Sequence, residues 1–137
     1  YTRVMRYKGE KGKAWEAVKR WVRRTLKDCY TCPAKDLESY NAQAGHYQPV
    51  GLVGSNNTRA WDDRFIRFQC GYCNGTGQGM QVVFRKNLVK EHGEKIVAEY
   101  DRQVASKSYS AVKNWLEIKE HFDNLYYPLP GSVIVKS

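Results

Sequence analysis

Two pairs of cysteines carry the clearest chemical signal in this sequence. Cys29 and Cys32 form one CxxC pair, Cys70 and Cys73 form another, and the chain has no further cysteine. In a reducing cytosol paired knuckles of this kind typically hold zinc, whereas a secreted chain would use four cysteines for two disulfides. Four thiolates match the tetrahedral preference of a closed structural site. The cysteines are therefore predicted to hold a structural zinc ion.

A histidine and an asparagine accompany the pairs in an order that suggests catalysis. His46 lies between the pairs, and Asn74 directly follows the second. Phosphodiester hydrolysis needs a base that activates water and a divalent cation that neutralises charge on the phosphate. A neutral imidazole suits the first task, and an oxygen ligand suits Mg²⁺ or Mn²⁺. His46 is the candidate general base and Asn74 the candidate ligand of the catalytic cation.

Simpler interpretations exist for each of these features. A histidine beside a tyrosine is often only hydrogen bonded, and an asparagine after a knuckle can cap a helix. The stretch CGYCNGTGQG over 70–79 also matches one CxxCxGxG repeat of DnaJ-type chaperones. Those zinc domains resemble four tandem repeats, however, and here Cys32 is followed by Pro-Ala-Lys-Asp instead of glycines. The joint order of the pairs, His46 and Asn74 favours the catalytic interpretation.

Charge and composition indicate the class of partner. The 137 residues fit one domain spanning 1–137, and 23 Lys and Arg against 14 Asp and Glu leave a net charge of +9. Such an excess on a small domain favours a polyanion such as DNA. Neither a membrane-spanning apolar window nor a signal segment is present, so no membrane partner and a cytoplasmic location are expected.

The elements that must position these residues can be predicted from periodicity. Residues 12–28 predict a helix with an apolar stripe that includes Trp15, Val18 and Leu26, backed by a basic stripe. Strands are expected over 44–53 and 64–69, separated by a loop over 54–59. Helices are expected over 80–92, 94–106 and 109–125, with residues 112, 115, 118, 122 and 125 facing inward, followed by a non-helical tail over 126–137.

These elements predict an α+β fold. A small zinc-stapled core over 29–92, of the ββα-metal (HNH-like) type, is flanked by the N-terminal basic helix over 12–28 and by C-terminal helices over 93–125. In this arrangement zinc would hold the strand that carries His46 next to the helix that begins near Asn74. The two side chains would then converge on one phosphate.

The sequence resembles the NinG or Rap family of phage recombination proteins, which are similar to HNH nucleases. The resemblance covers about residues 13–105. It is carried by the preceding helix and by Asp28-Cys-Tyr-Thr-Cys32, Gln43-Ala-Gly-His-Tyr47 and Gln69-Cys-Gly-Tyr-Cys-Asn74, with Gly79 nearby. The same layout looks like that of phage recombination endonuclease VII. The combination of Gln43-Ala-Gly-His-Tyr47 with Gln69-Cys-Gly-Tyr-Cys-Asn74 is far more specific than CxxC alone.

The resemblance implies a phage-encoded endonuclease that acts in the bacterial cytoplasm. It would cleave branched DNA, such as Holliday junctions and displacement loops, with His46 as general base, Asn74 on Mg²⁺ or Mn²⁺, and zinc on the four cysteines. Two departures from the HNH pattern are present. Gly45 stands where many of these nucleases have a metal-binding aspartate, which leaves Asp62 or Asp63 as candidate substitutes. Phe65 stands where an asparagine often orients the active-site loop.

Two groups of basic residues are candidates for binding DNA phosphates. One group lies on the predicted N-terminal helix and the other flanks the predicted site; they are Lys19, Arg20, Arg23 and Arg24, and Arg59, Arg64 and Arg67. If both groups face the same side of the protein, they would form a groove that recognises the structure of DNA rather than its base sequence. If they do not, they are scattered surface charge. Two cuts resolve a four-way junction, so a homodimer through the helices after residue 93 is also expected.

Two rival functions remain open at this stage. One is a branched-DNA binder that does not cut, which Gly45 and Phe65 keep plausible. The other is a zinc-stapled protein adaptor whose aromatic residues form a partner surface. Metal-dependent cutting of a junction distinguishes the nuclease from the first rival, and salt-dependent DNA binding would argue against the second.

Overall fold

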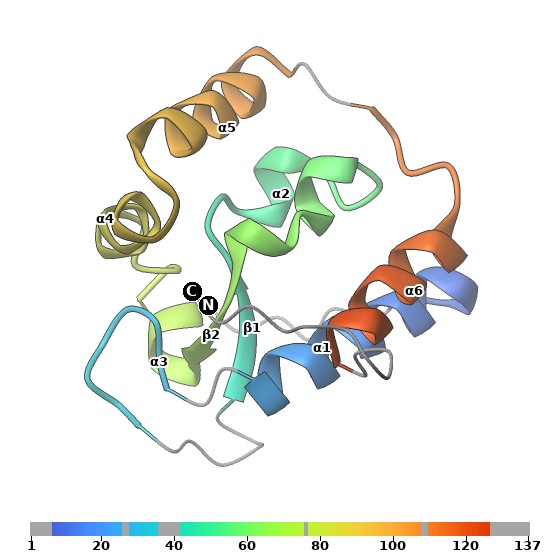
Figure 1. The fold of residues 1–137 in the computed structure, drawn as a ribbon, viewed down its shortest axis with the longest axis horizontal. Helices are drawn as coiled ribbons and strands as arrows, with labels where there is room; N and C mark the ends of the chain where they lie inside the picture. The colour runs from blue at the N-terminus through green and yellow to red at the C-terminus, as the bar shows by residue number, and fades with distance from the viewer. Residues whose placement is uncertain (1–6, 26–27, 36–41, 76, 108–109, 127–137) are drawn as a thin grey trace, which may run out of the picture.

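The protein has a mixed α+β fold in which a two-stranded hairpin lies between helices (Figure 1). The computed structural model describes residues 7–25, 28–35, 42–75, 77–107 and 110–126. Within these residues there are six α-helices, two short 3₁₀ helices and one antiparallel sheet. Helices α1 and α6 lie on one side of the hairpin, and α4 and α5 lie on the other.

The hairpin is formed by β1 (Ala42–His46) and β2 (Ile66–Cys70). The register runs from Ala42 opposite Cys70 to His46 opposite Ile66. All five residues of β2 are buried, which is consistent with a strand covered on both faces. Helix α3 (Gly71–Asn74) follows β2 without a linker, so the second cysteine pair spans the strand end and the first turn of this helix.

Helix α1 (Gly9–Thr25) supports the hairpin through its apolar stripe. Trp15, Val18, Trp21 and Val22 are buried, as the periodicity predicts, and Trp21 packs against Phe122 of α6 (Trp115–Tyr126) with ring centroids 5.4 Å apart. The stripe therefore serves two neighbours, the hairpin and α6. Leu26, the remaining expected member of the apolar stripe, lies outside the described residues.

The segment between the strands is built from short helical turns. Helix α2 (Val50–Val53) is followed by η2 (Thr58–Trp61) and η3 (Asp63–Phe65). The side chain of Asn57 accepts a hydrogen bond from the backbone N–H of Arg59, and Asp62 accepts one in the same way from Arg64. Each side chain therefore caps the turn that follows it, which satisfies donors that the turn leaves free.

Two longer helices complete the described fold. Helix α4 (Gln81–His92) and helix α5 (Glu94–Ser106) are separated by Gly93, whose φ of +94° is one that a residue with a side chain rarely adopts. Phe84 and Leu88 of α4 are buried in the main core. Tyr100 of α5 stacks on Phe65 with ring centroids 3.8 Å apart, which attaches α5 to the turn before β2.

The structure confirms some predicted boundaries and corrects others. The helices expected over 80–92 and 94–106 are present as α4 and α5, and residues 112, 115, 118, 122 and 125 pack on the core as expected. The strand expected over 44–53 is wrong beyond His46, because Pro49, which cannot donate to a sheet, precedes α2. The strand expected over 64–69 begins at Ile66 because η3 occupies 63–65.

The last helix also begins later than its periodicity suggests. Helix α6 starts at Trp115 instead of residue 109, because the preceding segment pairs with the loop between the strands. The backbone N–H of Val112 donates to Asn56 O at 2.7 Å, and Asn114 Oδ1 then accepts from Leu116 N at 3.0 Å at the start of the helix. The non-helical tail expected over 126–137 is wrong at Tyr126, which is the last residue of α6, and residues 127–137 lie outside the described residues. Among the residues described, no helix is long and apolar enough to cross a membrane.

Candidate metal centre and catalytic cleft

The four cysteines lie together in one cluster. Their Sγ atoms are all within 4.8 Å of one another, and Cys32 Sγ is 3.7 Å from Cys70 Sγ. Zinc–sulfur bonds of about 2.3 Å in a tetrahedron give sulfur–sulfur edges of roughly 3.8 Å. The donor set and the spacing therefore fit a structural zinc ion.

Local backbone geometry holds the two knuckles in place. Cys29 and Cys32 lie in the loop after α1, where the backbone N–H of Tyr30 donates to Phe68 O of β2 at 2.8 Å. The backbone N–H of Cys70 donates to Cys29 Sγ at 3.4 Å, and that of Cys73 donates to Cys70 Sγ at 3.5 Å. Such N–H donors stabilise thiolate charge around a metal. The cluster joins the end of α1 to the junction between β2 and α3.

Replacing Cys73 by serine is expected to remove zinc and destabilise the protein. The side chain is fully buried, and structural zinc affinity contributes directly to folding free energy. We expect loss of stoichiometric zinc by elemental analysis and a melting temperature lower by about 10 °C or more in circular dichroism. Tyr72→Ser is the matched control, because Tyr72 lies in the same turn but is 63% exposed. An unchanged melting temperature in Cys73→Ser would contradict the structural role.

His46 and Asn74 line the same open cleft. The cleft has a volume of about 760 Å³, and Gln78, Gly79 and Gln81 from the loop after α3 and the start of α4 contribute to it. His46 is the last residue of β1, and Asn74 is the last residue of α3. The hairpin and the helix that follows it thus bring both predicted residues to one surface.

The environment of His46 determines its protonation. The ring stacks on Trp15 of α1 with centroids 5.6 Å apart, and Nε2 lies 2.8 Å from the carbonyl oxygen of Ala60. Burial lowers the pKa of His46 to about 4, although the Ala60 contact raises it in part. The ring is therefore neutral at pH 7. Since a carbonyl oxygen only accepts, Nε2 carries the proton and Nδ1 keeps its lone pair.

Asn74 is oriented by a second amide. Its Nδ2 donates to Gln43 Oε1 at 2.8 Å, and Gln43 lies on β1 three residues before His46. With Nδ2 engaged in this bond, Oδ1 is the atom that can act as an oxygen ligand for a hard cation. Hydrogen bonding to β1 therefore sets the direction of the amide relative to the strand that carries His46.

Asn57 contributes to the site in a way that the sequence analysis missed. This residue is only 8% exposed, and besides capping η2 its carbonyl accepts from the backbone N–H of Ala60 at 3.0 Å. It therefore holds the turn whose Ala60 carbonyl orients His46. An asparagine two residues before Arg59, in a position that favours an Asx turn, is the signal that could have identified it.

Gly45 and Gln69 explain why no aspartate precedes His46. A Cβ atom at Gly45 would lie 1.8 Å from Gln69 Oε1. Gln69 is fully buried, and its Nε2 donates to Thr31 Oγ1 at 3.0 Å and to Gly79 O at 2.9 Å. The amide of Gln69 thus fills the space that a side chain at position 45 would need.

A double-mutant cycle can test this close contact. We expect Gly45→Ala to lower the free energy of unfolding by about 1–3 kcal/mol in urea titrations, because the added methyl overpacks the site. In a Gln69→Ala background the same change is expected to cost little. Gly51→Ala is the control, because nothing lies within 4 Å of its added Cβ. An equal penalty in both backgrounds would show that Gln69 is not the obstacle.

The other residues named for the HNH pattern have structural roles. Asp62 pairs with Arg64 at 2.8 Å, Asp63 accepts from His121 at 2.8 Å, and neither aspartate lines the cleft. Phe65, at the position expected for asparagine, is buried in the core. Among the described residues that line the cleft there is no carboxylate.

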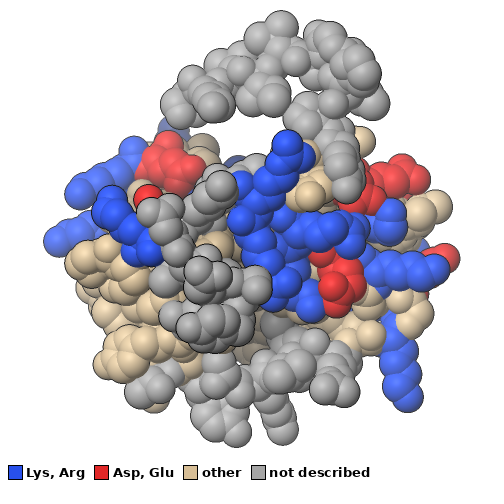
Figure 2. Space-filling view, turned by 90° about the horizontal axis from the view of Figure 1, so that it is seen from below, with Lys and Arg blue, Asp and Glu red and all other residues tan. Residues whose placement is uncertain are grey.

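The structure separates the predicted basic residues into different environments. On α1, Lys19 pairs with Glu16, Arg20 pairs with Asp123 of α6, and Arg24 donates to Tyr126 O. Arg23 is exposed. Lys and Arg side chains gather on the side of the molecule where α1 lies, with a few carboxylates among them (Figure 2). Part of this basic stripe therefore helps to dock α6.

The second basic group is divided between the core and a small cavity. Arg67 is 6% exposed, and its guanidinium binds Glu91 at 2.8 Å and the Asp63 carbonyl at 2.7 Å. These bonds occupy Arg67 in holding β2 to α4. Arg59 and Arg64, in contrast, line a cavity against α5.

The comparison with protein families assigns the chain. A family model described as NinG, the bacteriophage lambda NinG protein, matches residues 3–126. The chain belongs to the NinG family. No curated protein and no solved structure matches it. The NinG assignment agrees with the resemblance inferred from the cysteine pairs, His46 and Asn74.

Proposed function

We propose that this NinG-family protein is a metal-dependent, structure-selective DNA endonuclease that cuts branched recombination intermediates. Holliday junctions and displacement loops are the proposed substrates. The observation that carries the proposal is the neutral His46 ring in the lining of the cleft that Asn74 shares. Its Nε2 is bound to the Ala60 carbonyl, which leaves the lone pair on Nδ1. The net charge of +9 supports a polyanionic partner.

In the proposed mechanism, Nδ1 of His46 accepts a proton from a water molecule that attacks the phosphorus atom. The Ala60 carbonyl keeps the other ring nitrogen protonated, so only Nδ1 is free to act as the base. Asn74 Oδ1 would hold a Mg²⁺ or Mn²⁺ ion, which would neutralise charge on the scissile phosphate and on the leaving 3′ oxygen. Zinc on the four cysteines would be purely structural.

The order of elements supports a ββα-metal core. The antiparallel hairpin is followed directly by α3, and the two functional residues end β1 and α3. Helix α3 stops at Gly75 after one turn, and the chain becomes helical again at Gln81. We infer a shortened metal helix whose only protein ligand in the cleft is neutral, so that substrate phosphates would supply the anionic ligands.

A cleavage assay with matched histidine variants tests this proposal. Wild-type protein is expected to cut a labelled four-way junction with Mg²⁺, to spare a matching linear duplex, and to be inactive in EDTA. His46→Gln is expected to lower the single-turnover rate by about 100-fold or more while keeping the donor to Ala60. His121→Ala is the control, because His121 binds Asp63 away from the cleft. Equal rates for His46→Gln and wild type would refute the role of His46.

The pH dependence of cutting gives a second test. A base with a pKa of about 4 is about 90% unprotonated at pH 5, whereas an ordinary histidine would be only about 3% unprotonated. The single-turnover rate is therefore expected to stay nearly constant from pH 7.5 to pH 5 and to fall as the pH approaches 4. A rate that falls with an apparent pKa near 6.5 would contradict the lowered pKa of His46.

The second candidate is a protein that binds branched DNA without cutting it. The absence of a carboxylate among the described residues of the cleft favours this alternative, because a neutral amide alone binds divalent cations weakly. Salt-sensitive junction binding with no cutting under Mg²⁺ or Mn²⁺ would support it. The expected homodimer through the helices after residue 93 stays a prediction that light scattering can check.

A further inference from the structure

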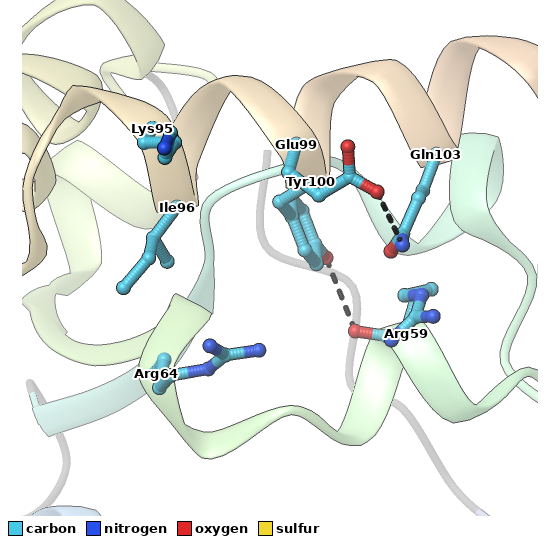
Figure 3. A pocket seen from close by; sticks show the side chains of 7 residues that line it. All are labelled: Arg59, Arg64, Lys95, Ile96, Glu99, Tyr100 and Gln103. Atoms are coloured by element: carbon cyan, nitrogen blue, oxygen red, sulfur yellow. Dashed lines mark hydrogen bonds between the residues drawn. The ribbon is translucent and has the colours of Figure 1, made fainter.

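A second cavity lies on α5, apart from the cleft of His46. Its volume is about 290 Å³, and its walls come from the turns between the strands and from one face of α5 (Figure 3). Cations dominate its charged side chains, which are Arg59, Arg64, Lys95 and Glu99. Apolar surface from Tyr100 and Ile96 completes the wall, and Ile96 is 39% exposed.

Only part of the positive charge around this cavity is balanced, because Arg64 pairs with Asp62 whereas Arg59 and Lys95 form no ion pair within the described residues. Arg59 Nε is buried, and among the described residues it has no hydrogen-bond partner. Arg64 is held by two bonds to Asp62, which orient its guanidinium. No ion pair involves Lys95 within the described part of the chain. A buried donor without an acceptor is costly, so a cavity of this kind favours an anion.

The one carboxylate in the wall is already engaged. Glu99 accepts from Arg102 at 2.6 Å and from Gln103 at 2.8 Å. These bonds engage Glu99 on its own helix, and Glu99 interacts with Arg59 only through a weaker Coulomb attraction without a hydrogen bond. Guanidinium groups bind phosphate oxygens through paired N–H donors, and a lysine adds a point charge. The apolar wall beside them suits the sugar of a nucleotide.

One short turn connects this cavity to the proposed catalytic cleft. The hydroxyl of Tyr100 donates to the carbonyl of Arg59 at 3.1 Å, while His46 Nε2 binds the carbonyl of the next residue, Ala60, at 2.8 Å. The two sites therefore border adjacent residues of η2. A strand held at Arg59 would be fixed relative to the turn that orients His46.

We propose that the cavity of Arg59, Arg64 and Lys95 is a subsite for a backbone phosphodiester of a DNA strand. The identity of the ligand as DNA rests on the proposed function, whereas the preference for a phosphate group follows from the cavity alone. Contacts to backbone phosphates position a nucleic acid without reading its bases. A strand held by this subsite would lie beside the η2 turn whose next carbonyl orients His46.

The first arm of the test uses a dinucleoside monophosphate, thymidylyl-thymidine, as the probe. The Arg59 Nε–H resonance of the full chain is followed by NMR during titration. We expect a saturable shift of this signal, and about tenfold weaker binding in Lys95→Gln. Lys86→Gln, on the exposed face of α4, is the control for the loss of one charge. No shift of the Arg59 signal would overturn the subsite.

The second arm measures DNA binding in EDTA by fluorescence anisotropy over a series of salt concentrations. Arg59→Gln combined with Lys95→Gln is expected to weaken junction binding by about tenfold and to reduce the salt slope by about one. Lys86→Gln is expected to change neither by more than about twofold. Unchanged affinity and slope in the double variant would overturn the subsite. A change in oligomeric state with unchanged DNA affinity would also overturn it, because the cavity would then be a protein interface.

Failure of this inference differs from failure of the proposed function. Cutting of the junction by wild type with Mg²⁺ reports only on the cleft of His46, and a nuclease can lack the α5 subsite. Conversely, an Arg59 shift without any cutting would keep the anion subsite while the nuclease proposal fails.

Discussion

The cluster of four cysteines is the constraint on which the rest of the structure depends. A two-stranded hairpin is only marginally stable by itself in water. Here its second strand ends at Cys70 inside the cluster, and the other knuckle follows α1. A metal ion held by this cluster would fix α1, β2 and α3 relative to one another, and β1 is held through its register with β2. His46 and Asn74 acquire their positions from this frame.

The packing of Gln69 against the strand of His46 stabilises the fold but removes a place for a metal-binding side chain. Gln69 connects the first knuckle, through Thr31, to the loop after the second knuckle, through Gly79. Its carbonyl oxygen, which has no hydrogen-bond partner among the described residues, lies against Gly45. The same packing that joins the knuckles excludes a carboxylate at position 45. A cation in this cleft would have to depend on the substrate for negative charge.

The turn over Thr58–Trp61 has a second organising role. Asn57 caps it, Tyr100 of α5 binds its Arg59 carbonyl, and its Ala60 carbonyl selects the tautomer of His46. Helix α5 therefore supports His46, the proposed general base, through this turn without contacting it. The aromatic stack of Phe65 on Tyr100 holds α5 in place, which gives a structural reason for phenylalanine at a position where the HNH pattern has asparagine.

The sequence alone was sufficient for the features that depend on local pattern. The spacing of the cysteines indicated one cluster, the apolar period indicated the buried face of α1, and the patterns over 80–92 and 94–106 indicated two separate helices. Each of these follows from backbone geometry within a few residues. The order of the cysteine pairs, His46 and Asn74 likewise predicted two residues that the structure brings to one cleft.

Tertiary packing decided what no local pattern contains. The sequence does not distinguish Arg67 from the exposed Arg64, but the place of Arg67 on β2 buries it beside Glu91. The conflict between Gly45 and Gln69 arises from neighbouring strands whose residues are far apart in the chain. Arg59 and Lys95 meet only because α5 packs over the turn between the strands. Side-chain charge and size are set by the sequence, whereas their partners depend on long-range contacts.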